Sequence, residues 1–178
     1  MCNKKYLQKA VFLDRDGVIC EDTDYVTSFD KLRIYPYARE AIELIHKKGY
    51  LAIVITNQSG VARGMMTEDT LLQINEYLKE ETGVDAIYYC PHLPPEGEEI
   101  HPYRIFCNCR KPDSGLIEQA IADYKIDREK SYMVGDRETD IMAGKKAGLK
   151  TVWIKSIHNG DMADYIHKSL EEFALNIM

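Results

Sequence analysis

One stretch, residues 10–18 (AVFLDRDGV), constrains the fold of this chain more than any other. Four apolar residues predict a buried strand, Asp14 and Asp16 follow it, and Gly17 lets the backbone turn away. Buried carboxylates are costly unless positive charge lies beside them, so this arrangement calls for a metal ion, a lysine or arginine, or both. The alternative for this stretch alone is a strand that leaves the core through a solvated acidic turn.

Five short apolar runs, each expected to be a strand, alternate with segments of helical spacing. The strands are expected over 10–14, 51–55, 86–90, 131–134 and 150–154, and the helices over 37–48, 68–81, 115–124, 138–147 and 161–175. This alternation predicts an α/β fold in which helices cover both faces of a five-stranded parallel sheet. The length of 178 residues suits a single domain over residues 1–178.

Two segments break the alternation. Residues 20–36 are too long for a simple strand-to-helix turn, and we expect a flap or small hairpin over the carboxyl end of the first strand. Residues 91–112 are rich in proline and lack periodicity. Long loops in compact domains usually have a function or a cross-link that holds them, so both segments are candidates for function.

The net charge of −6 and the lack of a dominant lysine or arginine run argue against a nucleic-acid or anionic-membrane surface. The first nine residues are polar and lack the apolar core of a signal peptide. No stretch approaches the roughly 20 apolar residues of a membrane span. We expect a cytoplasmic protein that acts as a monomer on a small molecule.

Chemically suggestive residues follow three of the predicted strands. Asp14 and Asp16 follow the first strand, residues 56–60 (TNQSG) follow the second, and residues 135–140 (GDRETD) follow the fourth. Residues 110–112 (RKP) precede the helix that leads into the fourth strand. Ligands of an open parallel sheet bind outside the carboxyl ends of its strands, so these groups are expected around one point. Carboxylates, a hydroxyl, amides and two cations suit Mg²⁺ and phosphoryl transfer to an aspartate.

Four motifs of this chain resemble, in order, those of the haloacid dehalogenase superfamily of phosphatases. They are residues 14–17 (DRDG), 56–58 (TNQ), 110–112 (RKP) and 135–140 (GDRETD), and the resemblance spans about residues 10–154. It implies a Rossmann-like, essentially capless fold and a Mg²⁺-dependent phosphatase whose partner is a small phosphorylated metabolite.

The same resemblance implies a role for each motif residue. Asp14 is expected to attack phosphorus and become an aspartyl-phosphate, while Asp16 protonates the leaving oxygen and then activates water. Thr56 and Lys111 are expected to hold the phosphoryl oxygens. The expected Mg²⁺ ligands are Asp14, Asp136 and the backbone carbonyl of Asp16.

Three of the five cysteines share a short window with a histidine. Cys90, His92, Cys107 and Cys109 form two close pairs, and a Cys₃His set suits a closed tetrahedral Zn²⁺ site. Such a site leaves no position for water, so zinc is expected to stabilise the loop over 90–109. The alternatives are buried free thiols beside an incidental histidine, or a redox pair of cysteines. His101, in the same loop, is a competing ligand or a surface residue.

Residues 56–64 (TNQSGVARG) and 88–92 (YYCPH) resemble the heptose-bisphosphate and histidinol-phosphate phosphatase group of the superfamily. This resemblance implies hydrolysis of the 7-phosphate of D-glycero-D-manno-heptose 1,7-bisphosphate, with histidinol phosphate as the alternative substrate. An alternative of another class is an inactive, zinc-stabilised interaction module. The residues implied to contact substrate are Asp22, Thr23, Asp24, Tyr25, Asn57, Gln58, Ser59, Arg110 and Arg137.

Three further residues have open roles. Asp140 is expected to orient Lys111 or a metal-bound water, or only to favour the N-terminus of its helix. Arg63 lies beside the expected pocket, and the alternative is a solvated loop charge. For Arg15, a role in the site and a surface position directly after the strand are both open.

Overall fold

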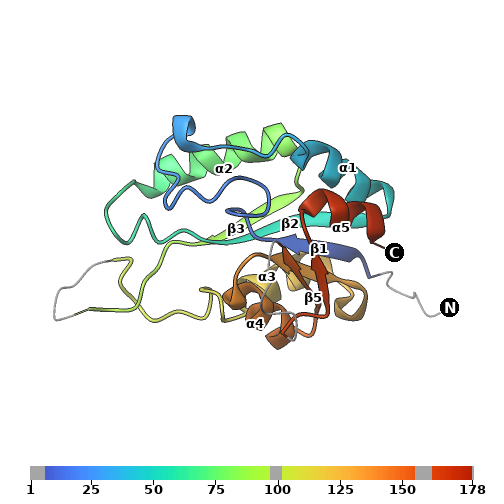
Figure 1. The fold of residues 1–178 in the computed structure, drawn as a ribbon. Helices are drawn as coiled ribbons and strands as arrows, with labels where there is room; N and C mark the ends of the chain where they lie inside the picture. Colours follow the sequence, from blue (N-terminus) through green and yellow to red (C-terminus); the bar gives the residue numbers. More distant parts are fainter. Residues whose placement is uncertain (1–6, 97–101, 155–161, 178) are drawn as a thin grey trace.

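The computed structural model describes residues 7–96, 102–154 and 162–177. Within these ranges the chain forms one six-stranded parallel sheet (Figure 1). The strands are β1 (Lys9–Leu13), β2 (Tyr50–Asn57), β3 (Ala86–Cys90), β4 (Tyr132–Gly135), β5 (Lys150–Ile154) and β6 (Tyr165–His167). Their order is β3-β2-β1-β4-β5-β6, so the chain builds outward from β1 to one side and then to the other. The end of β1 therefore lies at the point where the strand order reverses.

Helices cover both faces of the sheet (Figure 1). One face carries α1 (Ala38–Lys47), α2 (Glu68–Thr82) and α5 (Leu170–Asn176), and the other carries α3 (Gly115–Tyr124) and α4 (Glu138–Lys146). Two short 3₁₀ turns, η1 (Phe29–Lys31) and η2 (Arg128–Lys130), lie between these elements. None of the helices in the described ranges has the length and apolar character needed to cross a bilayer.

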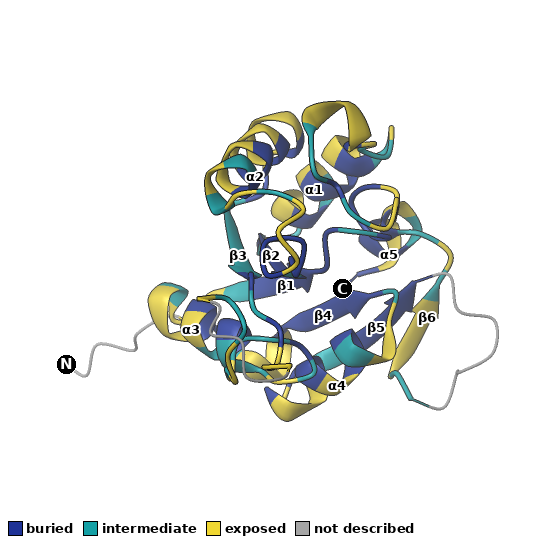
Figure 2. Ribbon diagram, turned by 90° about the vertical axis from the view of Figure 1, so that its left-hand side faces the viewer, coloured by how far each residue is buried: buried dark blue, intermediate teal, exposed yellow. Residues whose placement is uncertain are grey.

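Alternating side chains of β1 enter the apolar cores on the two sides of the sheet. Val11 and Leu13 belong to the core that includes residues of α1, α2 and α5, whereas Ala10 and Phe12 belong to the core that includes residues of α3 and α4. All four side chains are fully buried, and Figure 2 shows β1 as a buried strand between two helical layers. The apolar run before Asp14 is continuous because both faces of this central strand are covered.

The prediction of five strands is wrong, because residues 161–175 do not form one closing helix. Residue 161 lies outside the described ranges, β6 follows it, and α5 begins only after Ser169. The Asp164 carboxylate anchors β6 beside β5 by accepting from Thr151 N at 2.7 Å and from Thr151 Oγ1 at 2.8 Å. A three-residue strand is too short to show alternation. The Ser169 hydroxyl, which accepts from Glu172 N at 3.1 Å, marks the true helix start.

The segment predicted as a flap over 20–36 leaves and re-enters the fold at one place beside β1. Cys20 and Ile34 form an isolated antiparallel bridge, and Glu21 N donates to Arg33 O at 2.8 Å. Because the two ends are joined, the residues between them project as a loop with a fixed base.

The segment over 90–109 joins β3 to the loop that precedes α3. In its described part, Leu93 N donates to Tyr103 O at 3.0 Å, which draws the two arms of the loop together. Residues 97–101 lie outside the described ranges, so the competing ligand His101 does too.

Candidate active site

Asp14, at the carboxyl end of β1, lies against a buried lysine. Lys111 Nζ is 2.8 Å from Asp14 Oδ1 and 2.7 Å from Asp140 Oδ1, and it donates to Ile55 O at 2.7 Å. Lys111 is 3% exposed and Asp140 is 0% exposed. Three oxygen atoms, two of them from carboxylates, therefore lie within 2.8 Å of the ammonium nitrogen and compensate its buried charge.

The side chain of Asn57 holds Lys111 at this site. Asn57 Nδ2 donates to Lys111 O, and Asn57 Oδ1 accepts from Lys111 N, both at 3.0 Å. This two-point contact joins the end of β2 to a loop that is distant in the sequence. Thr56, one residue earlier on β2, is 1% exposed. The three motifs that contain Asp14, Thr56 and Lys111 therefore meet at one edge of the sheet.

Asp136 follows β4, and β4 pairs with β1, so Asp136 lies at the same edge of the sheet as Asp14. One carboxylate oxygen from each of Asp14, Asp136 and Asp140 lies within 4.8 Å of the others. Burial raises the pKa of Asp14 to about 7 despite the opposing charge of Lys111, and burial together with Asp140 raises the pKa of Asp136 to about 6. Lys111 alone does not neutralise three carboxylates, so the cluster favours a further cation.

Two glycines let the carboxylates approach one another. A Cβ atom on Gly17, which has φ +84°, would lie 2.0 Å from Asp136 Oδ2. A Cβ atom on Gly135 would lie 2.1 Å from Asp140 Cβ. Any larger residue at either position would displace a carboxylate of the cluster.

The sequence left the role of Asp140 open, and in the structure this residue contacts both Lys111 and the N-terminus of its helix. Its Oδ1 atom faces Lys111, and its Oδ2 atom accepts from Arg137 N at 3.0 Å, at the N-terminus of α4. One carboxylate thus satisfies a free helix amide and fixes a cation of the site.

The carboxylate of Asp16 contacts Arg15, Gln58 and the Cys20 thiol, whose Sγ lies 3.4 Å from Asp16 Oδ1. Arg15 Nε and Nη2 lie 3.0–3.2 Å from both of its oxygens. Gln58 Nε2 donates to Asp16 Oδ2 at 2.8 Å and to Thr56 Oγ1 at 2.9 Å. Arg15 is 0% exposed, so the alternative of a surface position is excluded.

A pocket of about 670 Å³ opens above this cluster, and Asp14, Asp16, Thr56 and Lys111 line it. Most residues predicted to contact substrate also line it: Asp22, Asp24, Tyr25, Asn57, Gln58, Ser59, Arg110 and Arg137. Thr23 is exposed and is not among the residues that line the pocket. Asp136 does not line the pocket either.

Several arginine side chains line the pocket. Arg110 Nη1 donates to His92 O at 3.2 Å, Arg137 forms an ion pair with Asp22, and the Arg63 guanidinium lies 5.8 Å from the Tyr25 ring centroid. Arg63 lines the pocket, which agrees with the interpretation that placed it beside the pocket. The lining also includes residues that the sequence did not assign to the pocket: Arg15, Val26, Pro112, Glu138 and Thr139. Glu138 and Thr139 lie within the motif over 135–140, which was their signal.

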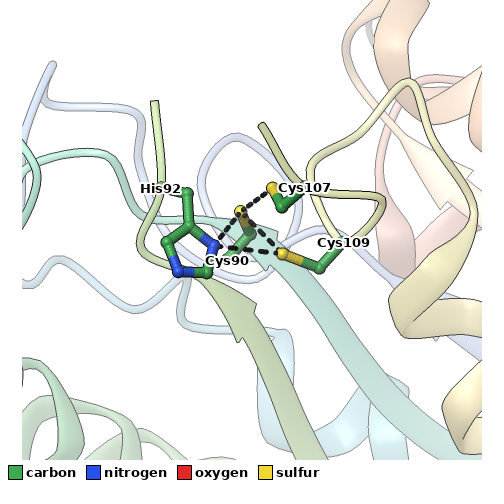
Figure 3. A group of neighbouring side chains, drawn as sticks. All are labelled: Cys90, His92, Cys107 and Cys109. Carbon is green, nitrogen blue, oxygen red and sulfur yellow. Dashed lines mark hydrogen bonds between the residues drawn. The ribbon is translucent and has the colours of Figure 1, made fainter. Parts of the chain in front are cut away.

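The four predicted zinc ligands come together at the end of β3 (Figure 3). Cys90 Sγ lies 3.7 Å from Cys107 Sγ and 3.2 Å from Cys109 Sγ, and His92 Nδ1 lies 3.3 Å from Cys109 Sγ. The sulfurs are too far apart for a disulfide, whose bond is about 2.05 Å. Burial and the neighbouring thiols raise the pKa of Cys109. The arrangement of donors suits a metal ion at the centre.

Comparison with known proteins agrees with this geometry. Residues 108–171 match the family model for HAD-hydrolase-like proteins. The chain is 45% identical over 151 residues to a D-glycero-beta-D-manno-heptose-1,7-bisphosphate 7-phosphatase of Haemophilus ducreyi, and the match covers 81% of each chain. This chain belongs to the HAD phosphatase family. HAD phosphatases hydrolyse phosphate esters, so the chain is an enzyme and the alternative of an inactive interaction module is not supported.

Two further HAD phosphatases support the family assignment. The D-glycero-D-manno-heptose-1,7-bisphosphate 7-phosphatase of Chlorobaculum tepidum is 39% identical over 163 residues, 85% of this chain and 80% of its own. The crystal structure of a D,D-heptose 1,7-bisphosphate phosphatase from B. bronchiseptica, complexed with magnesium and phosphate, superimposes with a TM-score of 0.81. It is 29% identical, and the match covers 94% of this chain and 96% of that one.

Proposed function

We propose that this phosphatase works through an aspartyl-phosphate on Asp14. In the first step an Asp14 oxygen forms a bond to phosphorus, the ester bond from phosphorus to oxygen breaks, and Asp16 gives its proton to the leaving oxygen. In the second step Asp16 takes a proton from water, the water oxygen bonds to phosphorus, and the bond to Asp14 breaks. The observation that carries this proposal is the position of Asp14, at a pocket, against Lys111.

Lys111 and Thr56 are proposed to hold the transferring phosphoryl group. Both line the pocket beside Asp14, and the ammonium of Lys111 is already fixed by its contacts. A positive charge that is in place before the reaction stabilises the developing negative charge without moving. Asp140 is proposed to keep Lys111 charged and aimed at this point.

The residues present fit a magnesium ion. Asp136 Oδ1 is buried and has no hydrogen-bond partner among the described residues, and the clustered donors are carboxylate oxygens, which Mg²⁺ prefers. We assign its ligands to Asp14, Asp136 and the backbone carbonyl of Asp16. When bound, Mg²⁺ would offset the negative charge of the substrate phosphate and of the carboxylates.

The Cys₃His cluster is proposed to bind a structural zinc ion. A tetrahedron with Zn–S bonds of about 2.3 Å has sulfurs about 3.8 Å apart, close to the separation of Cys90 and Cys107. Four protein ligands close the site to water. Because Lys111 follows Cys109 by two residues and Arg110 contacts His92, zinc would also fix one wall of the pocket.

We propose that the substrate is D-glycero-D-manno-heptose 1,7-bisphosphate and that its 7-phosphate is cleaved. The named relatives act on this class of compound. A bisphosphate also suits the pocket, since Arg63, Arg110 and Arg137 line it in addition to Lys111. One sheet with both of its helical layers carries all of these residues, which supports a single domain over residues 1–178.

The test measures Mg²⁺-dependent phosphate release from the heptose bisphosphate and from histidinol phosphate. We expect a higher kcat/KM for the heptose bisphosphate, and Asp14→Asn is expected to abolish release of phosphate from both. A preference for histidinol phosphate would overturn the substrate and leave the mechanism intact. Undiminished activity of Asp14→Asn would overturn the mechanism.

A further inference from the structure

Arg15 is a charged side chain with 0% of its surface exposed, and the proposed reaction assigns it no step. Burying a guanidinium is costly unless its donors are paired. Here Nε and Nη2 face both oxygens of Asp16 at 3.0–3.2 Å. The Asp16 side chain is 23% exposed, so the carboxylate lies between the buried guanidinium and the open pocket.

The guanidinium is itself fixed by two other elements. Arg15 Nη2 donates to Gln58 Oε1 at 2.9 Å, directly after β2, and Arg15 Nη1 donates to Asn75 Oδ1 at 3.4 Å, on α2. Asn75 is 5% exposed, so this end of the contact is also buried. A planar fork held in this way defines the plane of the carboxylate that it contacts.

Gln58 completes the arrangement on the pocket side. Its Nε2 atom donates both to Asp16 Oδ2 and to Thr56 Oγ1, while its Oε1 atom accepts from Arg15. The Asp16 carboxylate is therefore held from two directions, and its position is linked to that of the Thr56 hydroxyl.

We propose that Arg15 is a positioning residue that sets the orientation of Asp16 for both proton transfers of the reaction. The proposal rests on the acid and base role of Asp16 given above. Arg15 is among the residues that line the pocket, but its side chain is only 1% exposed, so we infer that it acts through Asp16. A lysine at this position would keep the charge but would replace the two-point contact with a single point.

The experiment is a double-mutant cycle on phosphate release from the heptose bisphosphate with Mg²⁺. Arg15→Met is expected to lower kcat on the order of 10²-fold, the lower range for the loss of general acid–base catalysis, with KM changed less than about 3-fold. In an Asp16→Asn background the same change is expected to cost less than about 2-fold, because the group that Arg15 positions is already gone. Arg15→Lys is expected to recover part of kcat.

Ile74→Ala is the matched control, since Ile74 is fully buried on α2 beside Asn75 and is not among the residues that line the pocket. It is expected to lower Tm and to leave kcat unchanged. Equal losses from Arg15→Met in both backgrounds would overturn the proposal and leave only a structural role. If Arg15→Met does not fold, a kcat of Arg15→Lys equal to that of the wild type would overturn it as well. Failure of the proposed function would be seen separately, as activity that survives Asp14→Asn.

Discussion

The carboxylate cluster and the Cys₃His cluster are both sets of metal-ligand side chains, but different parts of the fold hold them. Asp14 and Asp136 follow two paired central strands, and Lys111 already neutralises part of their charge. Cys90 ends β3, a strand at the edge of the sheet, and Cys107 and Cys109 lie on the loop that follows it. The first cluster is therefore organised by the sheet, whereas the second organises a loop.

Because the two clusters are held differently, removal of the proposed Mg²⁺ and removal of the proposed Zn²⁺ should have different consequences. The apolar cores on both faces of the sheet fix the ends of β1 and β4, so loss of Mg²⁺ should stop catalysis and leave the fold intact. The described part of the loop over 90–109 has few buried apolar side chains, and it exposes 84% of Phe106. Loss of Zn²⁺ should therefore disturb structure first and catalysis through it.

The largest effect is expected from Asp14→Asn. Loss of the nucleophile should lower kcat by ~10⁴-fold or more. The fold should persist, because burial already raises the pKa of Asp14 to about 7 and so favours an uncharged side chain there. Phosphate release and Tm are the two measurements. A large fall in Tm would show that this cluster, too, supports the fold.

A smaller effect is expected from Cys109→Ala. The variant should lose its zinc, lower Tm and reduce kcat/KM by about 10-fold, since Arg110 and Lys111 follow Cys109 directly. Metal content, Tm and phosphate release are measured together. Phe106→Ala is the control in the same loop, and it should change none of the three. Full activity in a zinc-free protein would refute the coupling between the loop and the pocket.

A further effect is expected on binding rather than on chemistry. Arg110→Ala should raise KM for the bisphosphate by about 10-fold, the value of one lost charge-assisted hydrogen bond, and should change kcat little. For a sugar monophosphate with no second phosphate, the same variant should show no comparable increase in KM. Equal changes with both substrates would place Arg110 at the cleaved phosphate instead.

The smallest effect is a pH dependence of stability in the Mg²⁺-free enzyme. Folding raises the pKa of Asp14 to about 7 and of Asp136 to about 6, so these groups bind more protons in the folded state than in the unfolded state. Their contribution to stability is full below pH ~4 and is lost as pH rises through 6 to 7. Tm of the Mg²⁺-free enzyme should fall by a few degrees across that window, and Asp136→Asn should weaken the dependence.

Adding Mg²⁺ tests whether the metal binds these carboxylates. Because a cation offsets the buried negative charge, Mg²⁺ should raise Tm more at pH 8 than at pH 5. An identical rise at both pH values would contradict the assignment of the metal to these carboxylates.

The location of the site could be predicted from the sequence, because parallel strands bring their carboxyl ends to one edge. Residues 14–17 and 135–140 each follow a run that is apolar on both faces, which fixes their place in the sheet. The cysteine and histidine spacing likewise identified a cluster that the structure brings together. These signals are local, and each depends only on the end of one element.

Contacts between distant side chains could not be predicted. Nothing near Arg15 in the sequence indicates that Gln58 and Asn75 accept from its guanidinium, so the sequence left its position open. β6 was missed because three residues carry no period, although Ser169 and Glu172 have the spacing of a helix start. Thr23 was assigned to the pocket with its neighbours, and the direction of a single loop side chain has no sequence signal.

The most direct test of the central claim is anomalous scattering from crystals of the enzyme in which Mn²⁺ replaces Mg²⁺. We expect a manganese peak at coordinating distance from both Asp14 and Asp136, beside Lys111, and a separate zinc peak within the Cys₃His cluster. A manganese peak that contacts only one of the two carboxylates, or that lies elsewhere in the molecule, would contradict the central claim.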